Sequence, residues 1–169
     1  MRDKEETKRK LLVAATQEFA EHGIAGARVD RIAKNAGCNK AMIYAYFCSK
    51  ENLFNEVLKI QIEDAIKNVP ITPDDLPGYA GRLFDRYREQ PEILRLAAYH
   101  RLESGTMPEA EQEAHKEKTK AIEKANLDTR WSAEELLNLV IHMSTIGLTT
   151  PNADRQLVEN AVAQLLRSK

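Results

Sequence analysis

An all-α fold is predicted for this chain of 169 residues. In most segments the apolar residues recur three and four positions apart, which is the spacing that gives a helix one apolar face. Glycine and proline fall between these segments, where helices usually end or begin. The length allows one or two small domains with enough chain to bury a core.

The composition is typical of a soluble globular protein. Charged residues make up 30% of the chain and the mean hydropathy is −0.51. No apolar run approaches the ~18 residues of a membrane span, and the first ten residues lack the apolar core of a signal peptide. We therefore expect a cytoplasmic protein without a membrane partner. Cys38 and Cys48 do not suggest a disulfide framework.

The first helix is expected over residues 8–22, because its apolar residues form one stripe. Gly23 follows as a C-cap residue. Phe19 lies on the apolar stripe and is expected in the core against Ile32 and Phe47. Lys8, Arg9 and Lys10, at the end of a charged lead-in over residues 2–10, could meet phosphates.

Residues 28–50 are predicted to form two short helices around a turn. Gly37 tolerates the left-handed backbone that ends the first helix, and Asn39 is a good N-cap for the second. The second helix is too short to be stable alone, so its neighbours must support it. This layout is that of a helix-turn-helix, whose second helix enters the DNA major groove. The apolar face of the first helix consists of Val29, Ile32, Ala33 and Ala36.

The second helix also has side chains that suit DNA. Ile43 and Phe47 can face inward, while a lysine, a tyrosine and small residues project outward. Such residues allow close approach to base edges, and a tyrosine hydroxyl can reach a phosphate. The alternative is a helical hairpin with a solvated lysine face. The outward residues are Lys40, Ala41, Tyr44 and Ala45, with Met42 on the flank.

Three motifs in one register carry a family resemblance. They are A-x-x-x-F-A-E-x-G before the turn motif, I-A-x-x-A-G inside it and I-Y-x-Y-F-x-S-K-E-x-L after it. Residues 7–58, which contain them, resemble the N-terminal domain of the TetR family of transcriptional regulators. The resemblance implies that double-stranded DNA is the partner and that Lys50 donates to a phosphate. The expected DNA-binding residues are Arg28, Asn39, Lys40, Ala41, Met42, Tyr44, Ala45, Tyr46 and Lys50.

The chain departs from the family pattern in two features, the missing helix cap at Ala27 and Arg28 and the acidic Asp30, where the family often carries a polar or basic residue. Ala27 and Arg28 stand where a threonine or serine commonly caps the first helix of the motif. A side-chain cap stabilises a helix by about 1 kcal/mol, so this helix start is expected to be looser, and Arg28 could instead bind a phosphate. Asp30 favours the helix N-terminus but repels phosphate, so no DNA contact is expected from it.

The charge divides along the chain. Residues 1–50 hold 10 Lys and Arg against 6 Asp and Glu, a net +4, whereas residues 51–169 hold 15 against 20, a net −5. A basic DNA-binding head on an acidic body fits this asymmetry, although chance clustering of surface charge would produce it too. We predict a helix-turn-helix DNA-binding domain over residues 1–50 and a helical ligand-binding and dimerisation domain over residues 51–169.

The second domain is expected to contain six helices in succession. Helical spacing indicates helices at about 50–68 and 74–90, separated by a Pro-rich break, and prolines open the next two at Pro91 and Pro108. The strongly charged helix over residues 108–125 is expected to face solvent. The last two helices, on either side of Pro151, are the most apolar, and one of them is apolar nearly all round, as a buried helix is.

By resemblance, the last two helices pair with those of a second copy as a four-helix bundle. A symmetric homodimer would place two recognition helices roughly 34–36 Å apart on a near-palindromic operator. The alternative is that these helices only complete the core of a monomer. The expected dimer residues are Leu139, Met143, Leu157, Val158, Ala161, Val162 and Leu165.

The resemblance also implies an unknown small-molecule effector that binds the second domain and releases a repressor from DNA. Aromatic residues at helical spacing are more often plain core, and the protein could instead be controlled by a protein partner docking on residues 108–125, or by no ligand. The candidate pocket residues are Tyr79, Phe84, Tyr87, Tyr99, His100, Trp131, His142 and Met143.

An enzyme is the hypothesis from another class. The four histidines do not have a metal-ligand spacing such as H-E-x-x-H, and neither a G-x-S-x-G motif nor a P-loop occurs. We therefore expect no catalytic residues, no metal and no cofactor.

Overall fold

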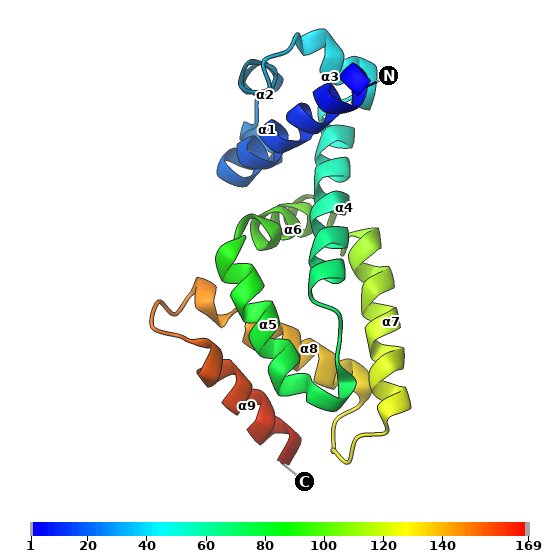
Figure 1. Ribbon diagram of the computed structural model, residues 1–169, viewed down its shortest axis with the longest axis vertical. Coiled ribbons are helices and arrows are strands. Elements are labelled where there is room, and N and C mark those ends of the chain that lie inside the picture. The colour runs from blue at the N-terminus through cyan, green and yellow to red at the C-terminus, as the bar shows by residue number, and fades with distance from the viewer. Residues whose placement is uncertain (1, 168–169) are drawn as a thin grey trace. The chain divides into compact units, whose positions relative to one another are not determined.

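The computed structural model describes residues 2–167, and every regular element in this range is a helix (Figure 1). The prediction of an all-α fold is confirmed. The helices are α1 (Arg2–Gly26), α2 (Val29–Asn35), α3 (Lys40–Phe47), α4 (Lys50–Asn68), η1 (Pro73–Asp75), α5 (Leu76–Glu89), α6 (Glu92–Ser104), α7 (Glu109–Ala125), α8 (Ala133–Ser144), η2 (Ile146–Leu148) and α9 (Arg155–Arg167).

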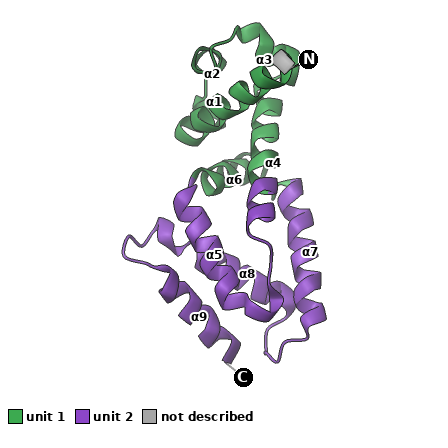
Figure 2. Cartoon of the chain, in the orientation of Figure 1, with its two compact units in different colours: residues 1–62, 92–108 green, residues 63–91, 109–169 purple. Residues whose placement is uncertain are grey.

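The chain divides into two compact units, which Figure 2 shows in different colours. Unit 1 comprises Met1–Ile62 and Glu92–Pro108, and unit 2 comprises Glu63–Pro91 and Glu109–Lys169. The boundary predicted after residue 50 falls at the first turn of α4. Contacts within the chain instead assign most of α4, and also α6, to unit 1.

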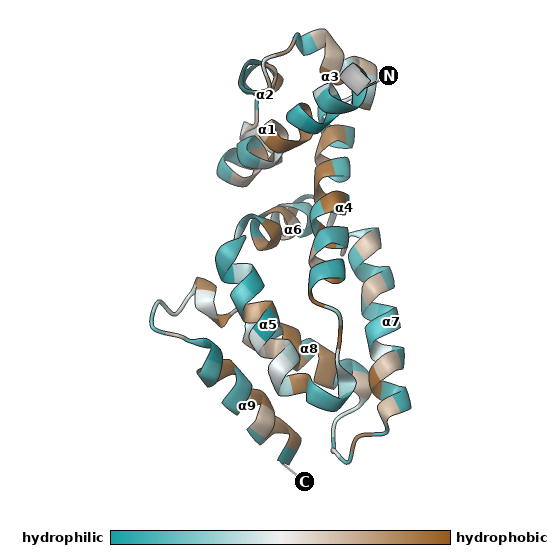
Figure 3. Cartoon of the chain, viewed as in Figure 1, coloured by the Kyte–Doolittle hydropathy of each residue, from teal (hydrophilic) through white to brown (hydrophobic). Residues whose placement is uncertain are grey.

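The core of unit 1 is built from the apolar stripes of its helices. Leu11 and Phe19 of α1, Ile32 of α2, Ile43 of α3 and Leu53 of α4 are all fully buried. Phe19 is therefore core, as predicted, and its ring meets that of Phe54 edge-on at a centroid distance of 5.1 Å. In Figure 3 hydrophobic and hydrophilic bands alternate along α4, as expected of a helix with one buried face.

Gly23 interrupts α1 where the sequence places a C-cap. Its backbone has φ 65° and ψ −179°, a conformation that is essentially restricted to glycine. The chain resumes a helical course to Gly26. The ring of Tyr99 on α6 packs over the glycine, 3.5 Å from where a Cβ would stand. The predicted pocket residue Tyr99 therefore serves to pack α6 on α1.

Unit 2 is organised around α5, which packs against both α8 and α9. The Ser144 hydroxyl of α8 is buried and donates to the carbonyl of Ala80 at 3.1 Å. On the α9 side, a Cβ at Gly81 would lie 2.3 Å from the Glu159 carboxylate, so the end of the Glu159 side chain packs directly over this glycine. A capping box of Ser132 and Glu135 begins α8.

The charged helix α7 does not lie free in solvent. It packs against α8 and η1, burying Ala114 and Ile122. Lys118 lies over the Tyr79 ring with its Nζ 5.7 Å from the centroid. The prediction of a solvent-facing helix was wrong for this side, because alanine lets the helix approach closely and a lysine stem can cover apolar surface. In the part of the chain that the structure describes, no helix is long and apolar enough to cross a membrane.

Candidate nucleic-acid interface

The predicted helix-turn-helix is present in unit 1. The turn between α2 and α3 contains Gly37 with φ 66°, and the Asn39 side chain accepts a hydrogen bond from the Ala41 N–H at 2.9 Å. Both residues thus have the local roles that the sequence indicates. Ile43 and Phe47 anchor α3 to the core, so its opposite face is presented outward.

Glu18 holds the start of α2 in place of a cap on the helix itself. Arg28 is the N-cap residue, and no side-chain cap hydrogen bond forms there. The Glu18 carboxylate of α1, only 4% exposed, accepts from the Arg28 N–H at 2.8 Å and from Arg31 Nε at 2.8 and 3.0 Å. Burial opposes the charge, but the bonds from Arg31 and Arg28 outweigh it and hold the pKa of Glu18 below its ordinary value.

Sequence reasoning missed Glu18. A signal was available, because Glu18 follows Leu11 and Ala15 on the inward stripe of α1, where an acid needs a partner. The partner could not be identified, since Arg31 lies thirteen residues further along the chain. The looser helix start expected from the missing serine or threonine is thus compensated from another helix.

The outward face of α3 carries the predicted side chains. Tyr44 is 46% exposed, although it is a large aromatic residue. Lys40, Ala41 and Ala45 are also exposed. Met42 and Tyr46 are half-buried, and the Tyr46 hydroxyl donates to the Lys4 carbonyl of α1 at 3.3 Å.

Lys40 does not stand alone on this face. Its Nζ lies 2.9 Å from Oδ1 and 3.1 Å from Oδ2 of Asp30, which is in the first turn of α2. The hydrogen bond with Asp30 raises the pKa of Lys40. The lysine therefore stays protonated, with a carboxylate beside it.

The Lys50 side chain is already hydrogen-bonded within unit 1, so it is not a free donor for a phosphate. Its half-buried Nζ donates to the Ile24 carbonyl at 2.7 Å and to that of Ala27 at 3.4 Å. This ties the first residue of α4 to the end of α1. These two bonds use two of the three ammonium protons of Lys50. The DNA contact predicted for Lys50 stays a prediction, and it would use the third proton.

A hollow of about 420 Å³ opens beside Tyr44 and Lys50. The Arg28 guanidinium on its rim makes no hydrogen bond or ion pair within residues 2–167. The first turn of α4 also borders the hollow, and the N–H groups at a helix start attract anions. Arg28 and the start of α4 can therefore bind a phosphate next to the exposed face of α3, while the carboxylates of Asp30 and Glu51, which line the same hollow, oppose it.

The candidate effector residues are divided between the two units. Tyr99 and His100 belong to unit 1, where His100 Nδ1 lies 3.2 Å from the Thr106 carbonyl oxygen. Tyr79 and Phe84 are fully buried in the core of unit 2. Half-buried side chains, namely Tyr87, Trp131 and Met143, pack against that core, and His142 is exposed.

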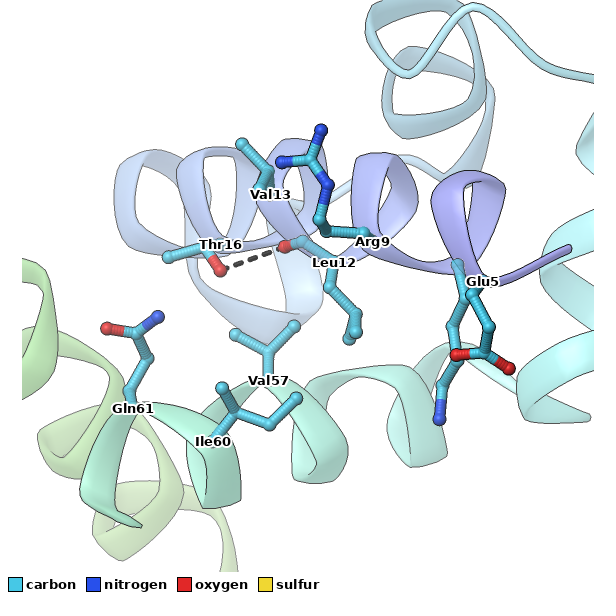
Figure 4. A pocket seen from close by; sticks show the side chains of 9 residues that line it. Glu5, Arg9, Leu12, Val13, Thr16, Val57, Ile60 and Gln61 are labelled. Carbon is cyan, nitrogen blue, oxygen red and sulfur yellow. Dashed lines mark hydrogen bonds between the residues drawn. The ribbon is translucent and has the colours of Figure 1, made fainter. Parts of the chain in front are cut away.

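A hollow of about 370 Å³ lies between α1 and α4 in unit 1, and Figure 4 shows the side chains that line it. Its floor is apolar, with Leu12, Val13, Val57 and Ile60 lining it. None of the eight candidate effector residues lines this hollow, and it lies within the unit that carries the helix-turn-helix.

Two predicted dimer residues are corrected. Val158 and Val162 are buried within unit 2, because the stripe of α9 faces α5 of the same chain. Leu157 is 48% exposed on the same helix. The other four predicted dimer residues are half-buried: Leu139, Met143, Ala161 and Leu165.

Within residues 2–167, no three His, Cys, Asp or Glu side chains are grouped so as to hold a metal ion. The fold and the interface instead define a helix-turn-helix DNA-binding protein with a second helical unit.

Comparison with known proteins assigns the family. Residues 11–57 match the model of bacterial regulatory proteins of the tetR family, and residues 75–167 match that of the tetracyclin repressor-like C-terminal domain. The chain belongs to the TetR family of transcriptional regulators, and it is a regulator rather than an enzyme.

Individual relatives agree with this assignment. The chain is 41% identical to the HTH-type transcriptional repressor SCO4008 of Streptomyces coelicolor, over 93% of this chain and 86% of that protein. The crystal structure of the regulator SCO4942 of Streptomyces coelicolor superimposes with a TM-score of 0.85 at 34% identity, covering 94% of this chain and 97% of that one. The HTH-type transcriptional activator FasR of Mycolicibacterium smegmatis is 33% identical over 39% of this chain and 30% of its own length.

Proposed function

We propose that this protein is a homodimeric repressor that binds a near-palindromic operator through α3 and is released by a small-molecule effector. The observation that carries the DNA-binding surface is the exposed Tyr44 beside the unpaired Arg28 guanidinium and the first turn of α4. Tyr44 and Lys40 contact base edges, and Arg28 binds a phosphate. DNA as partner makes the bacterial cytoplasm the site of action.

Repression is favoured by the relative that matches over most of the chain, which is a repressor. The similarity to an activator covers only 39% of the chain. A repressor needs no surface for recruiting polymerase, only an operator that overlaps the start of transcription. The proposed role is therefore to block transcription until an effector is bound.

The homodimer is proposed to form through the exposed sides of α8 and α9. Leu157 is exposed and Leu139, Met143, Ala161 and Leu165 are half-buried, so these side chains remain accessible after the chain has folded. Symmetric pairing would bury them and present two α3 helices to one duplex.

The effector is proposed to bind in unit 2 near Tyr79 and Trp131. The Tyr79 hydroxyl and the Trp131 indole N–H are buried, and no acceptor among residues 2–167 bonds either of them. Unpaired buried donors are costly, so a ligand with hydrogen-bond acceptors would be stabilised there. The effector shifts the protein off DNA only if it binds the DNA-incompetent dimer more tightly.

Gel-shift competition tests the DNA-binding surface, using genomic fragments selected by the wild-type protein. Tyr44→Ala is expected to weaken binding to the selected fragment more than binding to random DNA. Arg28→Ala is expected to weaken both equally and to reduce the salt slope by about one unit per head. Leu102→Ala, at an exposed position on α6, serves as the control. If the three variants bind alike, the assigned surface is wrong.

A thermal-shift screen against metabolites tests the effector. A bound effector raises the melting temperature, and it should also lower operator affinity. Control by a protein partner is the alternative, and the outer face of α7 remains exposed for it. That alternative is favoured if no metabolite shifts the melting temperature while an extract of the host releases the protein from DNA.

A further inference from the structure

The ion pair between Lys40 and Asp30 is the feature of the DNA-binding face that the proposed function leaves unexplained. It joins the first residue of α3 to the first turn of α2, with Nζ 2.9 and 3.1 Å from the two carboxylate oxygens. Both side chains are open to solvent, at 44% and 71% exposure. A negative charge therefore stands on a face that has to approach a polyanion.

The pair is not needed to hold the turn. The Cys38 N–H already bonds the Ala33 carbonyl at 3.0 Å, and the Asn39 side chain caps α3. Ile32 and Ile43 bury the two helices in the same core. Asp30 favours the N-terminus of α2, but that interaction does not involve Lys40, and exposed ion pairs add little stability, so stability does not account for the pair.

The pair is also unfavourable for binding phosphate. A phosphate that took Lys40 would have to displace Asp30 and leave that carboxylate unpaired beside the DNA backbone. A lysine already matched by a carboxylate also releases little counterion on contact with DNA. Asp30 therefore lowers the contribution of Lys40 to sequence-independent DNA binding.

One G·C base pair offers hydrogen-bond partners to both side chains of the Lys40–Asp30 ion pair at once. In the major groove guanine presents the acceptors O6 and N7, and its partner cytosine presents the N4 amino donor. Lys40 can donate its remaining proton to O6 or N7 of guanine while Asp30 accepts from cytosine, and the Lys40–Asp30 contact is kept. The side chains that pair with guanine and cytosine most readily include lysine and aspartate respectively.

We propose that Asp30 and Lys40 act together as a reading unit that selects one G·C base pair in each half-site. Asp30 is then a specificity-determining residue that also suppresses binding to other sequences. The inference rests on the proposed function, because it requires α3 to enter the major groove.

The experiment compares the wild-type chain with Asp30→Asn on the selected operator, on operators with each G·C pair changed to A·T, and on random DNA. The Asp30→Asn variant should bind random DNA more tightly. The slope of its log affinity against log salt concentration should be steeper by about 0.9 for each helix-turn-helix of the dimer. At one G·C position per half-site, discrimination should fall about tenfold, the size of one base contact. At the other positions discrimination should not change.

Glu51→Gln is the matched control. It removes the same charge from the same hollow, but Glu51 does not pair with Lys40. It should affect random DNA and the operator in equal proportion. A double-mutant cycle adds Lys40→Gln: if the two side chains read the base pair together, Asp30→Asn has a smaller effect on discrimination in that background than in the wild type. Melting temperatures of all variants show whether each is folded.

Each failure has a separate meaning. A wild-type protein that shows no preference for any fragment contradicts the proposed function itself. If the wild-type protein prefers its operator but Asp30→Asn discriminates every G·C position as well as it does, only the reading unit is refuted. If Asp30→Asn changes the affinity for the operator and for random DNA by the same factor, Asp30 acts only through its charge, and the inference is overturned.

Discussion

Replacing Glu18 with glutamine tests how the start of α2 is held. The glutamine has nearly the same shape, but it loses the charge that faces Arg31 and can accept through only one oxygen. In the wild-type protein the carboxylate accepts from Arg31 at 2.8 and 3.0 Å and from the Arg28 N–H at 2.8 Å. The bonds from Arg31 and from the Arg28 N–H are all expected to weaken in the variant.

The size of the effect follows from the burial of the pair. Breaking a fully buried ion pair costs about 3–5 kcal/mol. The Arg31 side chain is 39% exposed, so water can solvate it in the variant. The cost should then be close to that of losing a hydrogen bond to a charged group, about 2 kcal/mol. For a chain of this length that corresponds to a fall in melting temperature of roughly 4–8 °C.

Circular dichroism in the far ultraviolet gives the melting temperature. Hydrogen exchange of peptides that cover residues 28–36 gives the local opening free energy, which should fall by about the same amount. Glu21→Gln is the matched control, because that residue lies on the same helix but is exposed; a change within about 0.5 kcal/mol is expected for it. Equal stability of the two variants would refute the role given to Glu18.

Three further predictions concern stability. Gly23→Ala should destabilise by about 1–3 kcal/mol in urea unfolding because φ is 65° there, whereas Gly26→Ala, at a position without positive φ, should be neutral; equal effects would contradict the strain. Tyr79→Phe should leave the melting temperature unchanged or raise it, because the buried hydroxyl has no partner; a drop of several degrees would show that the hydroxyl is bonded. The pKa of Glu18 lies below its ordinary value of 4.5, so the stability difference between wild type and Glu18→Gln should be constant from pH 7 to about 5 and shrink as the pH falls below about 4.5 towards the lowered pKa of the folded state. A difference that stays constant or grows below pH 4.5 would contradict this assignment.

The features that could be predicted from the sequence are local ones. Gly37, Asn39 and the apolar spacing around Ile32 and Ile43 act within a few residues, so they indicate the turn and both of its helices. The same is true of the bounds of α4, which begins at Lys50 and ends at Asn68 as expected. The exposed position of Tyr44 follows from the burial of Ile43 and Phe47.

The features that were missed depend on contacts between helices. Glu18 pairs with Arg31, and Lys40 pairs with Asp30, across distances in sequence that helical periodicity does not connect. The stripe of α9 could face either a second copy or its own chain, and Val158 shows that it faces its own chain. For α7, the high content of charged residues predicted a solvent-facing helix, although one side of it is buried through Ala114 and Ile122.

Footprinting of the wild-type protein on its selected genomic fragment tests the central claim most directly. Two protected half-sites on one face of the duplex, with centres roughly 34–36 Å apart, are expected if a dimer presents α3 twice. Substitution of Tyr44 with alanine should remove protection of both half-sites. A single protected site, or protection without preference for any sequence at moderate salt, would contradict the claim that a paired α3 reads an operator.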